Sequence, residues 1–252
     1  MGSSVEGYST SSSSSTTGSQ IVETAKKYLG VAMNNLKNAA NLALNAANAL
    51  RETFMDDQHI RFHPIITHGG DSVNAIPDTV RLESYVRGAS MDAIMAANKK
   101  VNRALIGAAL SIGANVEILD LPGYAPLRNS TDMIKLCRDA YAAAFPDGEF
   151  TFSEVHSTGS TDMGDLSCIM PVVHPHVAGS AGIGHGNNYQ IADPEMACVG
   201  SAKWQLALAK LLLENGAARA KQIIADFKPQ FASAKEAIET YRAETGCIDQ
   251  DL

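Results

Sequence analysis

The sequence predicts an α/β fold of the α+β type, divided into two units. Segments with apolar residues on a helical period of 3.6 alternate with short, apolar, strand-like segments. In the first half their order is α-β-β-α-β, which corresponds to a split βαβ sandwich with one strand missing. The Pro/Gly stop LPGYAP then separates residues 34–122 from residues 123–252, where helices and mixed strands continue.

The chain begins with a segment in which we expect no regular structure. Residues 8–20, YSTSSSSSTTGSQ, hold too few apolar side chains to offset the entropy cost of ordering, so we assign residues 1–20 to a disordered head. Residues 21–33 have an amphipathic pattern and form a helical lead-in. The Ala- and Leu-rich segment 34–54 has the stronger pattern and predicts the first helix of the first unit.

Two strands, a helix and a third strand complete the first unit. Residues 60–67 and 79–87 are strand-like, and the turn-rich stretch HGGDSVNAIPD between them predicts that they pair antiparallel. Ser90 is a suitable N-cap for a helix over residues 91–112, which a glycine follows. Residues 115–121 return as a strand. We therefore expect a ferredoxin-like unit that lacks one strand.

The second unit is expected to combine helices with mixed strands around a segment crowded with acids, histidines and glycines. The pattern predicts a helix over residues 130–145 and a strand over 150–156, followed by the crowded segment, 161–195. Three further helices are expected over residues 194–216, 217–227 and 233–245. The long helix can begin at Pro194, because proline suits the first turn of a helix.

Composition and charge exclude several classes of protein. With 252 residues, 45% of them hydrophobic, the chain can bury a substantial core. The net charge of -7 and the lack of clustered Lys and Arg argue against a nucleic-acid partner. No apolar run approaches the roughly 20 residues of a membrane helix. The four cysteines are widely spaced without a CxxC pair, so we expect reduced thiols in a cytoplasmic protein.

Residues 161–195 are the strongest candidate for a functional site. Three histidines fall within twelve positions, and the surrounding glycines let the backbone approach a ligand or a metal. His185 lies between glycines, which suits a metal or substrate ligand, but a loop histidine without a role fits equally well. His174 and His176 share one face of an extended segment and could chelate, and a partly exposed strand edge is the alternative.

Two further groups of polar residues have a functional and a structural interpretation. Asp162 and Asp165, in GSTDMGD, suit a turn that presents a carboxylate or backbone donors to a substrate, or ordinary Asx-turn chemistry. Asn74 and Arg87 could form a fork for a carboxylate, because Arg offers bidentate donors and Asn a further amide. A satisfied loop Asn and a solvated Arg are the alternatives, and composition does not separate them.

Three stretches together carry a resemblance to a known family. RETFMDDQHIRFHPIITHGGDSVNAIPDTVRLESYVRGASMDA, GSTDMGDLS and GIGHGNNYQIADPE resemble the amidohydrolase branch of the zinc aminoacylase, carboxypeptidase and dipeptidase family. The resemblance covers roughly residues 36–234. Its first part is similar to that family's lid domain, which mediates dimerisation, and its later part to the C-terminal portion of a catalytic domain with a mixed sheet.

The resemblance implies a chemistry and a set of roles. Members of this family hydrolyse amide bonds of N-acyl amino acids, dipeptides or similar small substrates, with two zinc ions that activate a bridging water. It implies that His185 is the last zinc ligand. It also implies that Asn74 and Arg87 hold the substrate carboxylate, the Asn from a partner subunit, and that Ser160 and Asp162 line the substrate pocket. A homodimer through the lid is expected.

The chain also departs from this family. Its other ligands come from a His-x-Asp motif, a bridging Asp and a Glu-Glu pair in an N-terminal half, and this sequence contains neither His-x-Asp nor adjacent Glu-Glu. A His-Ala motif that opens the lid is replaced by the Ser-rich tract and residues 21–32. We therefore assign no catalytic residue and expect a truncated or split member, inactive alone.

Two other interpretations remain open. The chain could be a catalytically inactive dimerisation or interaction module derived from such an enzyme, or an unrelated α/β binding protein that carries loop histidines. Stoichiometric zinc binding would separate the enzyme from the interaction module. If a covering half is absent, exposed sheet edges and apolar faces also predict association or instability.

Overall fold

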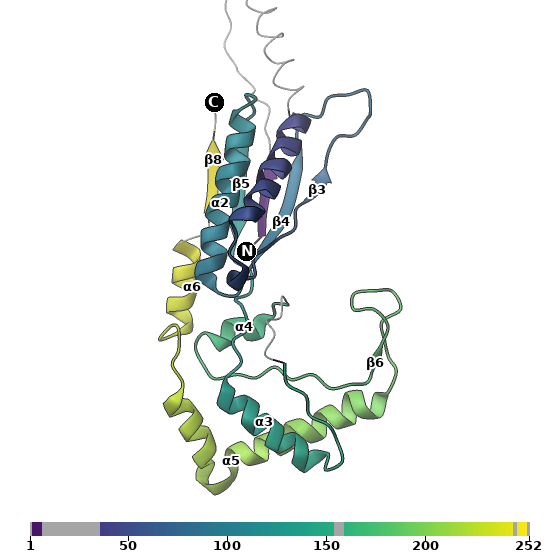
Figure 1. The fold of residues 1–252 in the computed structure, drawn as a ribbon, viewed down its shortest axis with the longest axis vertical. Coiled ribbons are helices and arrows are strands. Elements are labelled where there is room, and N and C mark those ends of the chain that lie inside the picture. Colours follow the sequence, from purple (N-terminus) through teal and green to yellow (C-terminus); the bar gives the residue numbers. More distant parts are fainter. Residues whose placement is uncertain (1, 7–35, 154–158, 244–245, 251–252) are drawn as a thin grey trace, which may run out of the picture. The chain divides into compact units, whose positions relative to one another are not determined.

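The computed structural model describes residues 2–6, 36–153, 159–243 and 246–250, and it confirms the predicted mixture of helices and sheets. The chain divides into two compact units (Figure 1). The first contains the described residues up to 126, together with residues 159, 238–243 and 246–250. The second contains residues 127–153 and 160–237.

The first unit is built on one antiparallel sheet. Its order is β2-β4-β1-β5-β8, and β3 also pairs with β4. The strands are β1 (Gly2–Glu6), β2 (Arg61–Phe62), β3 (Ile65–His68), β4 (Arg81–Arg87), β5 (Val116–Leu121) and β8 (Gly246–Gln250). β2 and β3 confirm that the segment after residue 60 pairs antiparallel with β4, but Pro64 lies between them and cannot donate a ladder hydrogen bond.

β1 corrects two expectations about the first unit. It lies between β4 and β5, so the sandwich that the sequence predicted to lack a strand has one at its centre. The assignment of a disordered head was wrong for Gly2–Glu6, whereas residues 7–20 and the lead-in at 21–33 lie outside the described residues. GSSVE has a single β-branched residue, but ladder hydrogen bonds to two neighbouring strands make up for its weak strand propensity.

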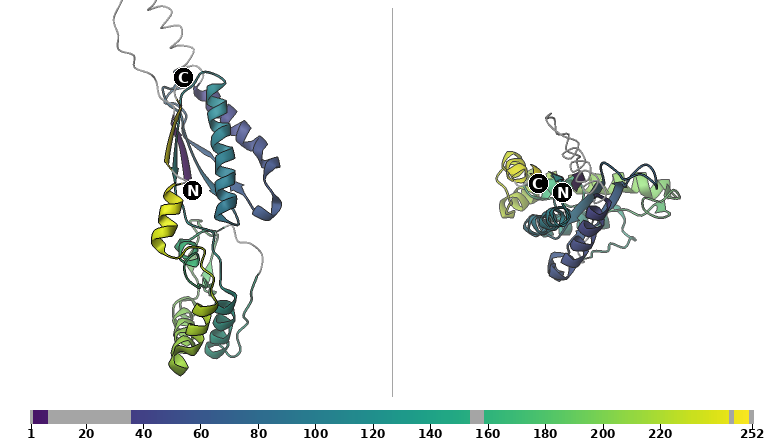
Figure 2. Two further views of the ribbon diagram at one scale, coloured as in Figure 1. Left: turned by 90° about the vertical axis from the view of Figure 1, so that its left-hand side faces the viewer. Right: turned by 90° about the horizontal axis from the view of Figure 1, so that it is seen from above.

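Two helices cover one face of this sheet, as Figure 2 shows. The first occupies residues 36–49 and continues as the short 3-10 helices η1 (Leu50–Thr53) and η2 (Asp56–Gln58). The second is α2 (Met91–Leu110), and the Ser90 side chain accepts a hydrogen bond from the Ala93 amide, which confirms the predicted N-cap. Alternate residues of β4, including Leu82 and Val86, are buried toward the helices.

The second unit is mainly helical. Its elements are α3 (Thr131–Ala144), α4 (Asp162–Ser167), β6 (Ser180–Ala181), β7 (Gln190–Ile191), the π-helix η3 (Glu195–Gly200), α5 (Ser201–Asp226) and the start of α6 (Ala234–Ala243). β6 and β7 form a two-stranded antiparallel sheet. α5 breaks at Glu214–Ala217, where Asn215, Gly216 and Ala217 have positive φ, and this confirms the predicted division into two helices. None of the helices in the described part of the chain is long and apolar enough to cross a membrane.

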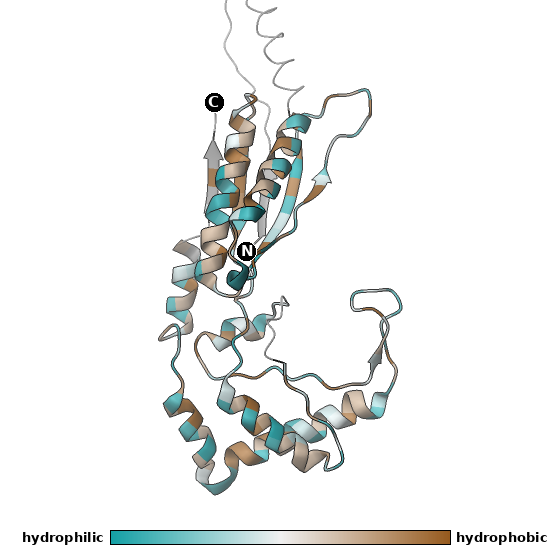
Figure 3. Cartoon of the chain, viewed as in Figure 1, coloured by the Kyte–Doolittle hydropathy of each residue, from teal (hydrophilic) through white to brown (hydrophobic). Residues whose placement is uncertain are grey.

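The core of the second unit lies between α3 and α5. Trp204 is buried against Cys137 and Ala140, and its indole N–H donates to the Cys137 carbonyl oxygen at 2.8 Å. The Tyr141 ring packs edge-on against the indole, with centroids 5.1 Å apart. Burial raises the pKa of the Cys137 thiol to about 11. Apolar side chains therefore hold this helix pair together. Hydrophobic residues along both helices are brown in Figure 3.

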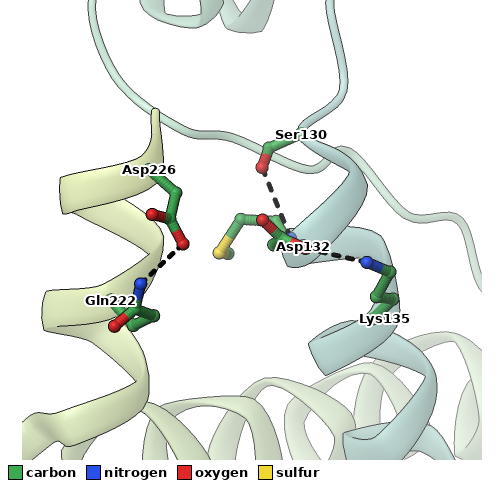
Figure 4. A network of polar contacts seen from close by, with 6 residues as sticks. Ser130, Asp132, Lys135, Gln222 and Asp226 are labelled. Atoms are coloured by element: carbon green, nitrogen blue, oxygen red, sulfur yellow. Dashed lines mark hydrogen bonds and ion pairs between the residues drawn. The ribbon is translucent and has the colours of Figure 1, made fainter. Parts of the chain in front are cut away.

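Two side-chain pairs on α3 and α5 are exposed and add little to this core, whereas the cap of α3 is partly buried. Figure 4 shows the Ser130 cap of α3, the ion pair of Lys135 with Asp132 at 2.9 Å, and the hydrogen bond from Gln222 to Asp226 at 2.7 Å. Exposed pairs of this kind contribute at most about 1 kcal/mol each, because water screens the charges and the side chains lose freedom.

Two predictions for the second unit were wrong. The strand expected over residues 150–156 is absent from residues 150–153, which have no regular structure, while residues 154–158 lie outside the described residues. The Phe150 ring packs against Trp204 instead, with ring centroids 6.1 Å apart. The turn expected in GSTDMGD is instead the helix α4, which Thr161 caps by accepting from the Met163 amide at 3.3 Å.

Candidate functional site

The first unit contains Asn74 and Arg87. Asn74 lies in the exposed loop between β3 and β4, where its Oδ1 accepts a hydrogen bond from the Ser72 hydroxyl. Arg87 is the last residue of β4 and is exposed, and its guanidinium carbon lies 5.5 Å from the centre of the Tyr85 ring. Both residues are exposed, as a carboxylate fork requires.

The second unit contains Ser160 and Asp162, which flank the cap of α4. Ser160 is half-buried, and Asp162 is exposed in the first turn of the helix. Thr161, between them, places its hydroxyl oxygen 3.5 Å from Nδ1 of His174. The structure thus brings one histidine of the crowded segment to the residues that the resemblance assigned to substrate binding.

The two histidines of the HPH motif do lie together. Their ring centroids are 5.2 Å apart, with the planes tilted by 32°. The segment is not a paired strand, so this part of the expectation was wrong. The His174 amide instead donates to Oδ1 of Asn129 at 3.1 Å, which anchors the backbone beside α3. Sequence reasoning missed Asn129 and Thr161, because neither stands in a metal-ligand or catalytic spacing.

His185 lies at the tip of the β6–β7 hairpin. Its side chain is exposed and its φ is +63°, an uncommon conformation for a residue other than glycine. The hairpin turns at Gly182, whose φ is +99° and whose added Cβ would lie 2.2 Å from the Asn188 carbonyl oxygen. The Asn188 side chain accepts from the Ile183 amide at 3.2 Å, which closes the loop. This backbone presents the imidazole outward.

The described residues do not fit the two zinc ions that the resemblance implies. A catalytic zinc takes three protein ligands, usually from His, Cys, Asp and Glu. Within residues 2–6, 36–153, 159–243 and 246–250, no three such side chains are grouped so that they could hold a metal ion. His185 therefore has too few co-ligands among the described residues for a catalytic metal.

Comparisons with known proteins find two curated dipeptidases that are similar in sequence to this chain. A stretch of 192 residues is 29% identical to the Xaa-Arg dipeptidase of Mus musculus and covers 71% of this chain and 42% of that protein. A stretch of 166 residues is 30% identical to the human Xaa-Arg dipeptidase, with 62% and 36% covered. This similarity agrees with the resemblance that the sequence motifs carry. The chain spans less than half the length of these relatives.

A solved structure agrees with this relationship at the level of the fold. The YxeP protein of Bacillus subtilis, described as a dinuclear metal binding peptidase from the M20 family, superposes with a TM-score of 0.52 at 17% identity. The match covers 84% of this chain and 49% of that protein. No protein-family model matches the chain. The predicted resemblance is thus confirmed, whereas the roles of individual site residues stay predictions.

Proposed function

We propose that this chain belongs to a metal-dependent hydrolase that cleaves amide bonds in N-acyl amino acids or dipeptides. The observation that carries the proposal is the match to two Xaa-Arg dipeptidases, over 192 and 166 residues. The resemblance implies a small substrate that presents a carboxylate. The exposed guanidinium at the end of β4 suits that group, because Arg can donate two parallel hydrogen bonds to a carboxylate.

The proposed roles follow the resemblance. His185 contributes one zinc ligand from its hairpin. Asn74 and Arg87 bind the substrate carboxylate, with Asn74 acting on the substrate of a partner subunit in a homodimer formed through the lid. Ser160 and Asp162 line the pocket, and their position around the α4 cap, which His174 contacts, supports a shared binding surface in the second unit.

We further propose that hydrolysis requires ligands that this chain does not supply. The sequence has no His-x-Asp motif and no Glu-Glu pair, so neither the remaining zinc ligands nor a general base can be assigned to it. His185 alone would hold a metal weakly. We expect activity only when another polypeptide or a longer form of the chain provides these groups.

The deciding experiment measures zinc content per purified chain after dialysis, together with hydrolysis of a panel of dipeptides with and without a chelator. His185→Ala is measured alongside, and His68→Ala serves as a matched histidine control in the first unit. We expect zinc well below one equivalent and no chelator-sensitive hydrolysis. A content near two zinc ions per chain that only His185→Ala lowers, together with hydrolysis, would overturn the proposal that the chain is inactive alone. It would show that the chain is itself the enzyme.

One observation favours an interaction module as the second candidate. The first unit has a central strand, a buried helix face and its own core. A unit that mediates dimerisation needs such a core of its own. The experiment above, combined with light scattering after size exclusion, separates the two candidates. A stable dimer without stoichiometric zinc supports the module, whereas a zinc-loaded, active protein supports the hydrolase.

A further inference from the structure

A polar cluster is buried inside the first unit, between α2 and β5. Asn98, Asn102 and Asp120 are only 4%, 6% and 5% exposed. The Nδ2 groups of Asn98 and Asn102 both donate to Oδ2 of Asp120, at 2.7 and 2.6 Å. The two asparagines are four residues apart on α2, so their side chains project from the same helix face toward one strand residue.

Three oxygen atoms of this cluster have no partner among the described residues. They are the Oδ1 atoms of Asn98, Asn102 and Asp120, and each is shielded from solvent. Exchanging the oxygen and nitrogen of either amide would place a carbonyl oxygen against the carboxylate, so Asp120 fixes both amide orientations. Buried acceptors without donors cost free energy, and a buried carboxylate costs more when no cation accompanies it.

The chemistry of these atoms points to a particular ligand. Because the oxygen and nitrogen of an amide are about 2.3 Å apart, each unpartnered amide oxygen lies within about 5 Å of Oδ2 of Asp120, and the unpartnered Oδ1 belongs to the same carboxylate. All three unpartnered atoms are hard oxygen acceptors, which are the ligands that alkali and alkaline-earth cations select. The cluster carries a single carboxylate, so a monovalent ion balances its charge, whereas a divalent ion would leave a buried positive charge.

We propose that Asn98, Asn102 and Asp120 bind a monovalent alkali cation, sodium or potassium, that ties α2 to β5. A buried water is the poorer match, because it has two protons for three acceptors. A proton on Asp120 would remove the charge but leave at least one amide oxygen without a donor. The site stabilises the first unit, and it is independent of whether the chain hydrolyses peptides.

Amide hydrogen exchange of the full chain tests the proposal. Exchange in α2 and β5 is compared in sodium, potassium and choline chloride at equal ionic strength, since choline cannot enter the site. A cation at ten times its dissociation constant should slow exchange through unfolding of this unit by about tenfold. We expect Asp120→Asn to abolish the difference between the salts. Asp132→Asn, which removes an exposed carboxylate from α3, should retain it.

Three outcomes would overturn the proposal. Equal exchange in all three salts would assign the cluster a water or a proton instead. Protection by magnesium or calcium but not by sodium or potassium would contradict the monovalent assignment. If Asp120→Asn fails to fold, sodium-23 NMR of the unmodified chain decides, because a bound ion broadens the sodium line and potassium competes it away. The site would likewise be refuted if the protein does not broaden the sodium line and potassium does not slow amide exchange in α2.

Discussion

The hairpin that presents His185 depends on one glycine, and replacing it provides a sharp test. Gly182 has a φ of +99°, and a Cβ at this position would lie 2.2 Å from the backbone carbonyl oxygen of Asn188. A backbone oxygen cannot move aside as a flexible side chain could. Gly182→Ala must therefore either strain the turn or open the β6–β7 pairing, which consists of only two residue pairs.

The size of the effect follows from the backbone conformation. A residue other than glycine in a sparsely populated φ region costs about 1–3 kcal/mol, which raises the population of the open hairpin by roughly 5- to 150-fold. Gly184 is the matched control in the same loop, because its φ lies outside the left-handed region and an added Cβ would meet nothing within 4 Å. Gly184→Ala should leave the hairpin closed.

Limited proteolysis reports this opening directly. Chymotrypsin can cut after Tyr189, which lies inside the hairpin, and the rate follows the open population when closing is faster than cleavage. We expect cleavage at Tyr189 to accelerate at least fivefold in Gly182→Ala and to stay within twofold of the parent in Gly184→Ala. Equal rates in the two variants would show that the conformation of Gly182 does not hold the loop.

Three further predictions concern the second unit. Trp204→Ala should destabilise it by about 3–5 kcal/mol in urea unfolding followed by circular dichroism, whereas Trp204→Phe keeps most of the packing and should cost about 1–2 kcal/mol; equal losses would show that the indole hydrogen bond dominates. Burial raises the pKa of the Cys137 thiol from 9.0 to about 11, so the contribution of this thiol to the stability of the folded state should fall as pH rises from about 9 to 11. Cys137→Ser should flatten that part of the profile of stability against pH. At pH 8, iodoacetamide should label the exposed Cys198 far faster than the buried Cys137. Leu206 and Leu213, exposed by 72% and 71% on α5, should promote self-association, and a double change to serine should reduce dye binding and particle size in light scattering; unchanged values would remove these side chains as the cause.

Local sequence signals predicted β4 well, because buried and exposed residues alternate along it. Leu82 and Val86 are buried between exposed residues of β4, and a period of two is readable without knowing the partner strand. Neither β1 nor β8 was found in this way, and β8 pairs with β5 in the first unit although residues 123–252 were assigned to the second. Gly2–Glu6 contains one strongly strand-forming residue, and its strand conformation depends on hydrogen bonds to β4 and β5, which are distant in sequence.

In the second unit, apolar composition was misleading. Phe150 suggested a strand, but its ring packs against Trp204 from a segment without regular structure. Periodicity cannot distinguish an apolar residue in a strand from one that fills a gap between helices. The same limit applies to the candidate site. The contact of Thr161 with His174 joins residues thirteen positions apart through a loop, so no spacing rule would have found it.

The position of His185 explains why relationship to a peptidase family and competence as a peptidase must be separated. Gly182 allows the hairpin to turn and so fixes where the His185 imidazole lies. This position serves a metal site only if other ligands lie beside the imidazole. The described residues provide no such group of ligands, and the stretch matched to the mouse dipeptidase covers 42% of that protein. If a longer form or a second polypeptide supplies the remaining ligands, zinc binding should become strong and sensitive to Gly182→Ala and His185→Ala alike. A zinc-loaded complex that tolerates both changes would place the metal elsewhere and remove the hairpin from the active centre.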